Sequence, residues 1–316
     1  MSDSPTSHST NPERAQSASA LAELGVTIAG QRIASAMNNP PRALLARAPL
    51  ILLPGALFPW SAYRSVLERL APERRVFALD WPAFDSSAQP DPEEFAYTPV
   101  HLAELVAQWM DALGVARAVL LADGESASVA IHFAAAHPQR TLGLALVGPR
   151  GVVPRDALAA ALHLPLRSPS LLRLAEGPLT ALALGPTTQE TQAIEERSRA
   201  ERRAEGDSAQ TERRARRLTA IVAFETAMDA AQPETLRLAR DIEAPCTVIR
   251  GGMDAFCPAS EARLTAEALG AKGALEVTLP DAGHLPHLQQ LERFYQALSG
   301  LIGGAEARLA ERLSAQ

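Results

Sequence analysis

Short, uniformly apolar runs recur along the chain. The runs "APLILLPG", "RRVFALDWP", "RAVLLAD", "TLGLALVGP", "PCTVIRGG" and "ALEVTLP" leave no solvated face, which is typical of parallel strands buried on both sides. Further upstream, "GVTIAGQRIASAM" alternates apolar and polar residues on both sides of Gly30, and this period of two favours an antiparallel hairpin. The pattern therefore predicts one hairpin followed by a series of buried strands.

Segments with helical periodicity separate these runs. "HLAELVAQWMDALG" places apolar residues at i, i+3, i+4 and i+7, and "WSAYRSVLERLA", "SVAIHFAAAHP" and "SEARLTAEALG" are helical in pattern as well. Strand and helix alternate, which predicts an α/β fold with crossover helices on both faces of the sheet.

The alternation stops once, between residues 152 and 242. This stretch contains no strand-like run and includes the charge-dense "EERSRAERRAEGDSAQTERRARR", a composition typical of a solvated helix face. We interpret 152–242 as a helical insertion that caps the sheet. The core is then expected over 23–151 and 243–304, with a helical tail over 305–316. Residues 1–22, rich in Ser, Thr, Pro and Asn, are predicted to be a disordered tail.

Composition narrows the class of protein. A chain of 316 residues with 47% hydrophobic content can bury one substantial core. Its net charge of -6 and pI near 5.7 argue against nucleic acid or an anionic membrane as the main partner. No apolar run reaches the roughly 18 residues of a membrane span, and no signal peptide is evident. Cys246 and Cys257 suit neither a disulfide framework nor a zinc site. We expect a cytoplasmic protein.

Four motifs occur in order between Gly25 and Gly303. "LLPGALFPWSAY" is similar to an HGx oxyanion loop, "LDWPAFDSSAQP" to D-x-P-G-F-G-x-S, "RGGMDAFCP" to G-x-x-D-x-x-x-P, and "PDAGHLPHLQQ" to G-A-G-H-x-x-x-x-E. Together they resemble the α/β-hydrolase superfamily, in its capped branch of esterases, lactonases, carbon–carbon hydrolases, dehalogenases and epoxide hydrolases. The resemblance implies a mostly parallel, twisted sheet flanked by helices.

The resemblance also implies roles for two residues. His284 would take and return a proton, and Asp254 would orient its imidazole and stabilise the charged form. Each has a simpler interpretation, since an Asp after a strand is often a helix cap and a His in a Gly-rich turn is often a surface residue. Their joint occurrence in the family's order favours function. His287 is expected to form pocket wall or a helix start.

The nucleophile is the point of departure from the family. The upstream "LGVARAVLLAD" and the downstream "HP" both place the nucleophile elbow at Gly124, where the backbone needs a positive φ that glycine adopts easily. Ser126 remains an alternative nucleophile, although a side chain there is expected to pack or to cap the helix. Asp123 and Glu125 are further candidates, since some members of the family attack with a carboxylate, although Asp123 is expected to face the core. Glu125 is expected to border the cavity as a base, substrate anchor or N-terminal helix residue.

The oxyanion hole is expected to persist without a serine. By the resemblance, its donors are the backbone amides of Ala56, next to Gly55, and of Glu125, and neither depends on the side chain. Ala83 and Asp85 stand where the family usually has glycine, which bears on the shape of the substrate pocket.

These residues leave several functions open. The first is an atypical hydrolase of a small apolar ester, lactone or thioester, acting through Ser126 or through water activated by His284. The alternatives are a pseudo-hydrolase that binds an apolar ligand, a non-hydrolytic lyase, cyclase or cofactor-free oxygenase, and a structural protein. No nucleotide-binding glycine fingerprint, P-loop or metal cluster occurs, so no cofactor is expected. The expected partner is a small apolar or acyl-type molecule, and no oligomeric state follows.

Overall fold

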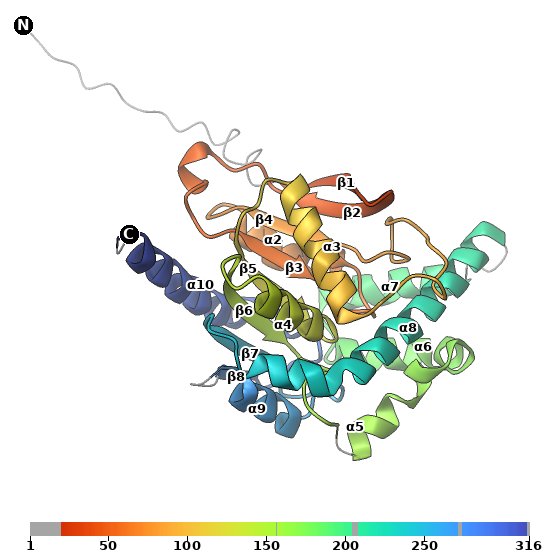
Figure 1. Ribbon diagram of the computed structural model, residues 1–316. Coiled ribbons are helices and arrows are strands. Elements are labelled where there is room, and N and C mark those ends of the chain that lie inside the picture. The colour runs from red at the N-terminus through yellow and green to blue at the C-terminus, as the bar shows by residue number, and fades with distance from the viewer. Residues whose placement is uncertain (1–19, 156, 204–207, 271–273, 315–316) are drawn as a thin grey trace, which may run out of the picture.

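The computed structural model describes residues 20–155, 157–203, 208–270 and 274–314. Within these ranges the strands form one eight-stranded sheet in the order β1-β2-β4-β3-β5-β6-β7-β8 (Figure 1). The last six strands of this order are parallel to one another: β4 Val76–Leu79, β3 Leu50–Leu53, β5 Ala118–Asp123, β6 Thr141–Val147, β7 Cys246–Gly251 and β8 Leu275–Leu279. The predicted mostly parallel sheet is confirmed.

The predicted hairpin forms one edge of the sheet. Strands β1 (Ala22–Ile28) and β2 (Gln31–Met37) pair antiparallel, and β2 continues antiparallel onto β4. Ala29 and Gly30 form the two-residue turn with φ of 48° and 80°, the left-handed pair that a tight hairpin turn requires. Residues 1–19 of the predicted tail lie outside the described residues.

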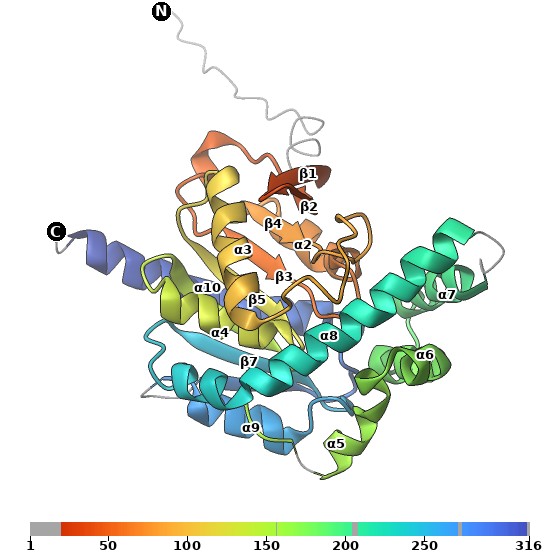
Figure 2. The same cartoon turned by 45° about the vertical axis from the view of Figure 1, so that its right-hand side comes forward.

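Helices cover both faces of the sheet. Helices α3 (Pro99–Ala112) and α4 (Ser126–Ala136) lie on one face, and α2 (Arg64–Leu70) and α10 (Leu291–Ser314) pack together on the other (Figure 2). Helix α9 (Ala259–Ala268) packs on β7 and β8. The start of α3 follows from local chemistry, because Pro99 suits the first helical position and the Thr98 hydroxyl accepts from the His101 amide at 3.3 Å.

The chain between β6 and β7 is helical wherever it is regular. It contains α5 (Ala157–Leu162), a short 3-10 helix η3 (Leu164–Arg167), α6 (Pro169–Leu184), α7 (Gln189–Arg203) and α8 (Ser208–Ala239). Helix α8 extends from beside α7 to the neighbourhood of β7 (Figure 2) and packs against α4. The Phe224 ring of α8 contacts Trp81 and Phe84, which follow β4. None of the described helices is long and apolar enough to cross a membrane.

Candidate active site

The turn between β5 and α4 is built around Gly124. β5 ends at Asp123, Gly124 has φ of 54°, and α4 begins at Ser126. A Cβ atom on Gly124 would lie 3.4 Å from His284 Nε2. A side chain at this position would therefore project directly towards the imidazole, in the geometry that joins a nucleophile to its base.

His284 and Asp254 form a buried hydrogen-bonded pair. The distance from His284 Nδ1 to Asp254 Oδ2 is 2.8 Å, and the two residues are 2% and 4% exposed. Asp254 Oδ1 accepts from the amides of Phe256 at 2.8 Å and Cys257 at 3.2 Å, which fixes the carboxylate. Burial lowers the pKa of His284, but the Asp254 carboxylate, and then Asp123, raise it above its ordinary value.

The loop that carries His284 is hydrogen-bonded to the helical segment, which is the chain between β6 and β7 with helices α5 to α8. The His284 amide donates to the Ala183 carbonyl at 2.9 Å. The Gln289 side-chain amide donates to the carbonyls of Leu184 at 2.8 Å and Pro186 at 2.9 Å, and its oxygen accepts from Gly283 at 3.3 Å. Gln289, where the family often has Glu, thus bridges the two segments, and sequence reasoning missed this role because its partners lie about a hundred residues away.

Asp123 reaches into the site. Its Oδ2 accepts from the Gly55 amide at 3.3 Å, and its Oδ1 lies 3.8 Å from His284 Nε2. Burial raises the pKa of Asp123, although His284, Tyr63 and Arg150 oppose the shift. Asp123 is buried, as expected, and its polar neighbours are the Gly55 amide and the His284 imidazole.

Glu125 binds the amide expected to belong to the oxyanion hole. Its Oε2 accepts from the Ala56 amide at 3.4 Å, and its Oε1 pairs with Arg150 Nη2. Burial raises the pKa of Glu125 to about 7, against the lowering effect of Arg150. The Ala56 amide is thus engaged by a carboxylate of the same chain.

Ser126 has other hydrogen-bond partners than the imidazole. Its hydroxyl donates to the Pro54 carbonyl at 2.5 Å and accepts from Trp81 Nε1 at 3.2 Å. The side chain is fully buried, and it connects the start of α4 to the ends of β3 and β4. This is the packing role that the helix-start position favours.

Charged groups from the helical segment lie close to this site. Glu225 of α8 accepts from His163 Nδ1 at 2.7 Å and from Arg155 Nη2 at 2.6 Å. Its negative charge raises the pKa of both Glu125 and Arg150. Sequence reasoning missed Arg150, His163 and Glu225, because no motif surrounds them and their pairing depends on how the helical segment folds back.

His287 packs behind the site. Its Nε2 donates to the Ala62 carbonyl at 2.8 Å, and its ring centroid is 4.0 Å from that of Tyr63. Burial lowers its pKa to about 4, so the ring is neutral. It lies inside the short 3-10 helix η4 (Pro286–Leu288), one residue after the helix begins.

A cavity of about 660 Å³ lies between the chain that follows β3 and helices α6, α7 and α8. Its lining is mixed. Apolar side chains come from both sides: Leu57, Phe58, Leu172, Leu179, Ile194 and Ile221. Charged side chains also line it: Arg64, Glu68, Asp85, Glu176, Glu190, Arg197, Glu201, Arg213, Arg214 and Arg217. Ala83 and Asp85 also line it, with φ of 71° and 41°, so this loop keeps the backbone that glycine favours although side chains are present. Leu57, next to Ala56, lines the cavity, whereas Gly124, Arg150 and His284 are not among its lining residues.

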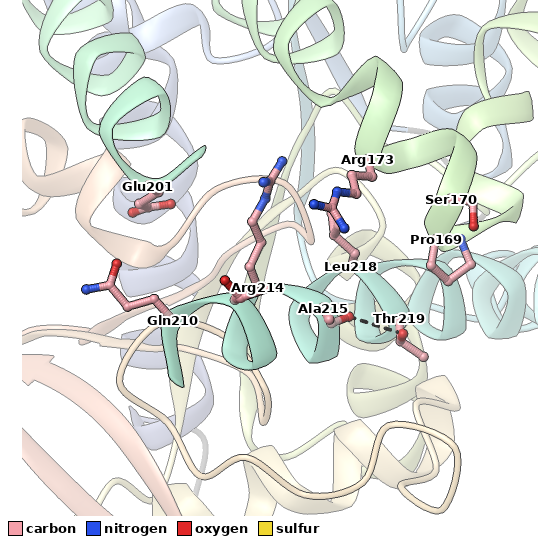
Figure 3. A pocket seen from close by; sticks show the side chains of 10 residues that line it. Pro169, Ser170, Arg173, Glu201, Gln210, Arg214, Ala215, Leu218 and Thr219 are labelled. Atoms are coloured by element: carbon pink, nitrogen blue, oxygen red, sulfur yellow. Dashed lines mark hydrogen bonds between the residues drawn. The ribbon is translucent and has the colours of Figure 1, made fainter. Parts of the chain in front are cut away.

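A smaller cavity of about 170 Å³ lies within the helical segment itself (Figure 3). Polar side chains of α6, α7 and α8 surround it, among them Glu201, Gln210 and Arg214. None of its lining residues belongs to the cluster around His284. In the described part of the chain, no group of three or more His, Cys, Asp and Glu side chains is placed to hold a metal ion.

Comparison with known proteins identifies the family of this chain. The model of the alpha/beta hydrolase family matches residues 50–297, and the chain belongs to that family. The expected fold class and the resemblance are thereby confirmed. A search of curated proteins finds no match.

Solved structures share the fold at low identity. An enol-lactonase from Burkholderia xenovorans is 22% identical with a TM-score of 0.67, covering 89% of this chain and 100% of that one. A haloalkane dehalogenase loop variant from Bradyrhizobium elkanii is 19% identical with a TM-score of 0.69, covering 93% and 100%. A bacterial membrane phospholipase A is 22% identical with a TM-score of 0.66, covering 93% and 89%.

Proposed function

We propose that the protein hydrolyses a small apolar ester, lactone or thioester without a covalent intermediate. His284, oriented by Asp254, takes a proton from a water molecule whose oxygen attacks the acyl carbon. The same proton then passes from Nε2 to the leaving group, and the products are a carboxylic acid and an alcohol or thiol. The observation that carries this proposal is the 2.8 Å contact of His284 with Asp254, with Nε2 directed at a glycine.

The neighbouring residues support the same reaction. Ser126 is proposed as a packing residue and not as the nucleophile, because its hydroxyl is engaged by Pro54 and Trp81. Gly124 is proposed as the elbow, where an attacking water takes the place of a side chain. Asp123 Oδ1, 3.8 Å from Nε2, is close enough to help position that water.

The amides of Ala56 and Glu125 are proposed as the oxyanion hole. The 3.4 Å contact from the Ala56 amide to Glu125 is at the long end for a hydrogen bond. A substrate oxygen at ordinary distance would therefore compete well with this carboxylate. Gly55 is proposed to allow the close approach, because a Cβ there would lie 2.9 Å from Asp123 Oδ2.

The helical segment is proposed as a cap, with boundaries near 152 and 242. Two observations support this: residues of α6, α7 and α8 line one side of the cavity of about 660 Å³, and the Ala183 carbonyl accepts from the His284 amide. The apolar part of the lining suits an apolar acyl group, which gains free energy when it leaves water.

A second candidate is a ligand-binding protein without turnover. The specific observation in its favour is the contact of Glu125 with the Ala56 amide, because it fills the expected oxyanion position in the free protein. Binding of an apolar ligand in the large cavity without product formation would identify this function.

The experiment compares p-nitrophenyl esters of graded chain length on the parent and on His284→Ala. General-base catalysis contributes roughly 10²–10⁴-fold, so the variant is expected to lose at least a hundredfold in kcat/KM. No burst of p-nitrophenol and no acylated protein by mass spectrometry are expected. His137→Ala, a partly exposed histidine at the end of α4, serves as the matched control. Equal activity of His284→Ala and the parent would overturn the proposal.

A further inference from the structure

Arg150 is a buried cation beside the elbow. It follows β6 and is 1% exposed. Its backbone amide donates to the Gly124 carbonyl at 3.0 Å, so the arginine and the elbow are held in one rigid arrangement. A buried charge is costly unless other groups pair with it, and the partners of this guanidinium therefore deserve a complete account.

The guanidinium faces the same point in space as His284. A Cβ atom on Gly124 would lie 3.4 Å from Arg150 Nη2, 3.5 Å from Arg150 Nε and 3.4 Å from His284 Nε2. An atom slightly above that point would thus meet two guanidinium nitrogens and one imidazole nitrogen. The missing side chain at Gly124 is what leaves these groups directed at a common position.

Part of the hydrogen-bonding capacity of Arg150 is unused. Glu125 Oε1 engages Nη2. Among the described residues, Nε and Nη1 have no hydrogen-bond partner, although both atoms are buried. The Phe256 ring lies 5.6 Å from the guanidinium carbon. Unsatisfied buried donors are unfavourable, and a guanidinium fork matches a planar acceptor with two oxygens.

We propose that Arg150 makes the space above Gly124 a binding site for the carboxylate group of a small organic acid. One carboxylate oxygen accepts from Nε, and the same group lies within reach of His284 Nε2. The inference rests on the proposed function for the identity of the reacting centre. It adds a ligand class to it, because the acid released by hydrolysis of an ester, lactone or thioester carries such a group.

Three buried acids, Asp123, Glu125 and Glu225, determine how much electrostatic repulsion a bound carboxylate would meet. Burial raises the pKa of Asp123, and it raises that of Glu125 to about 7, so both acids take up a proton more readily than exposed carboxyl groups do. The Glu225 carboxylate is paired with Arg155 and His163, and its charge also acts on Arg150. Arg150 nevertheless directs Nε and Nη2 towards the Cβ position of Gly124.

The experiment titrates the full chain with acetate, and with acetamide as a neutral probe of the same shape. Sodium chloride at equal ionic strength controls for a general salt effect. The readouts are the Tm, which rises when a ligand binds the folded state, and the imidazole signals of His284 in the NMR spectrum. Acetate is expected to raise the Tm and shift these signals, while acetamide and chloride leave both unchanged.

The variants assign the effect to Arg150. The double variant Arg150→Leu/Glu125→Leu removes a buried pair together, a change that proteins often tolerate. For the same rise in Tm, this variant is expected to need at least about ten times the acetate concentration that the parent needs. The reason is the loss of one charge-assisted hydrogen bond to the ligand. Arg150→Lys, which keeps the charge but not the fork, serves if the double variant does not fold, and the same weakening is expected. The double variant Arg216→Leu/Glu212→Leu removes a surface ion pair on α8, makes the same net charge change as Arg150→Leu/Glu125→Leu and is expected to respond like the parent.

Two results would overturn the carboxylate site: equal responses to acetate and acetamide, or unchanged acetate affinity in the folded Arg150 variants. Failure of the proposed hydrolysis looks different. If acetate binding depends on Arg150 but no ester is turned over, the carboxylate site stands and the hydrolase proposal falls. If esters are hydrolysed through His284 while acetate binding ignores Arg150, only the carboxylate site falls.

Discussion

Gly148 lies against the hydrogen bond between His284 and Asp254. A Cβ atom at this glycine would be 2.8 Å from His284 Nδ1 and 2.8 Å from Asp254 Oδ2. Gly148 also has φ of 47°, a conformation that side chains disfavour. The space that keeps these two groups together is therefore created by a residue without a side chain, outside any motif that the sequence displays.

Gly148→Ala is expected to displace the imidazole and lower kcat/KM about a hundredfold, because small misplacements of a catalytic group cost this much. The matched control is Gly303→Ala in α10, where no heavy atom lies within 4 Å of the added Cβ. The control should keep full activity and gain about 0.5–1 kcal/mol of stability. Ester kinetics and thermal unfolding measure both, and full activity of Gly148→Ala would contradict the assigned geometry.

The pH dependence of activity should report His284. A general base works in its neutral form, and the pKa of His284 is raised by Asp254 and Asp123, against burial and Arg150. The rate should thus rise with pH through an apparent pKa above about 6.5, the ordinary value for histidine. Asp254→Asn removes the carboxylate that raises the pKa of His284. The rise of kcat/KM with pH should therefore occur at lower pH, and the maximum value of kcat/KM should fall. A rise that stays at the same pH would argue that another group controls the rate.

Ser126→Ala should leave catalysis intact. The hydroxyl bridges Pro54 and Trp81, so its loss should lower the free energy of unfolding by about 1 kcal/mol. Ser128→Ala on the same helix is the matched control, because its hydroxyl is buried against Thr235 at 2.7 Å. Urea unfolding and ester hydrolysis distinguish the roles. A folded Ser126→Ala protein with no activity would restore Ser126 as the nucleophile.

Glu125→Ala should be strongly destabilising. It leaves the Arg150 guanidinium buried without its carboxylate partner, a change that costs about 3–5 kcal/mol. Glu212→Ala breaks an exposed pair with Arg216, whose side chains are 66% and 41% exposed, and should cost less than about 1 kcal/mol. Denaturant unfolding compares the two. Similar small losses would show that Arg150 finds compensation elsewhere.

Local patterns in the sequence determined the strands of the sheet, the hairpin and the positions of several site residues. Uniformly apolar runs predicted the parallel strands, because a strand covered on both faces has no polar side, and the alternation around Gly30 predicted the hairpin. Counting residues from the upstream "LGVARAVLLAD" and from the downstream "HP" predicted the turn between β5 and α4 at Gly124, and Gly124 has a positive φ. His284 and Asp254, predicted from separate motifs, lie within hydrogen-bond distance.

Only the tertiary structure decided what surrounds that pair. The contacts of Glu125 with Ala56, of Gln289 with Leu184 and of Gly148 with His284 join residues tens to more than a hundred positions apart. The direction of the Arg150 guanidinium likewise depends on how β5 and β6 end side by side. The hydrophobic pattern along a chain indicates which residues become buried on folding. The pairing of buried charges depends instead on distances between residues that only the folded chain brings together.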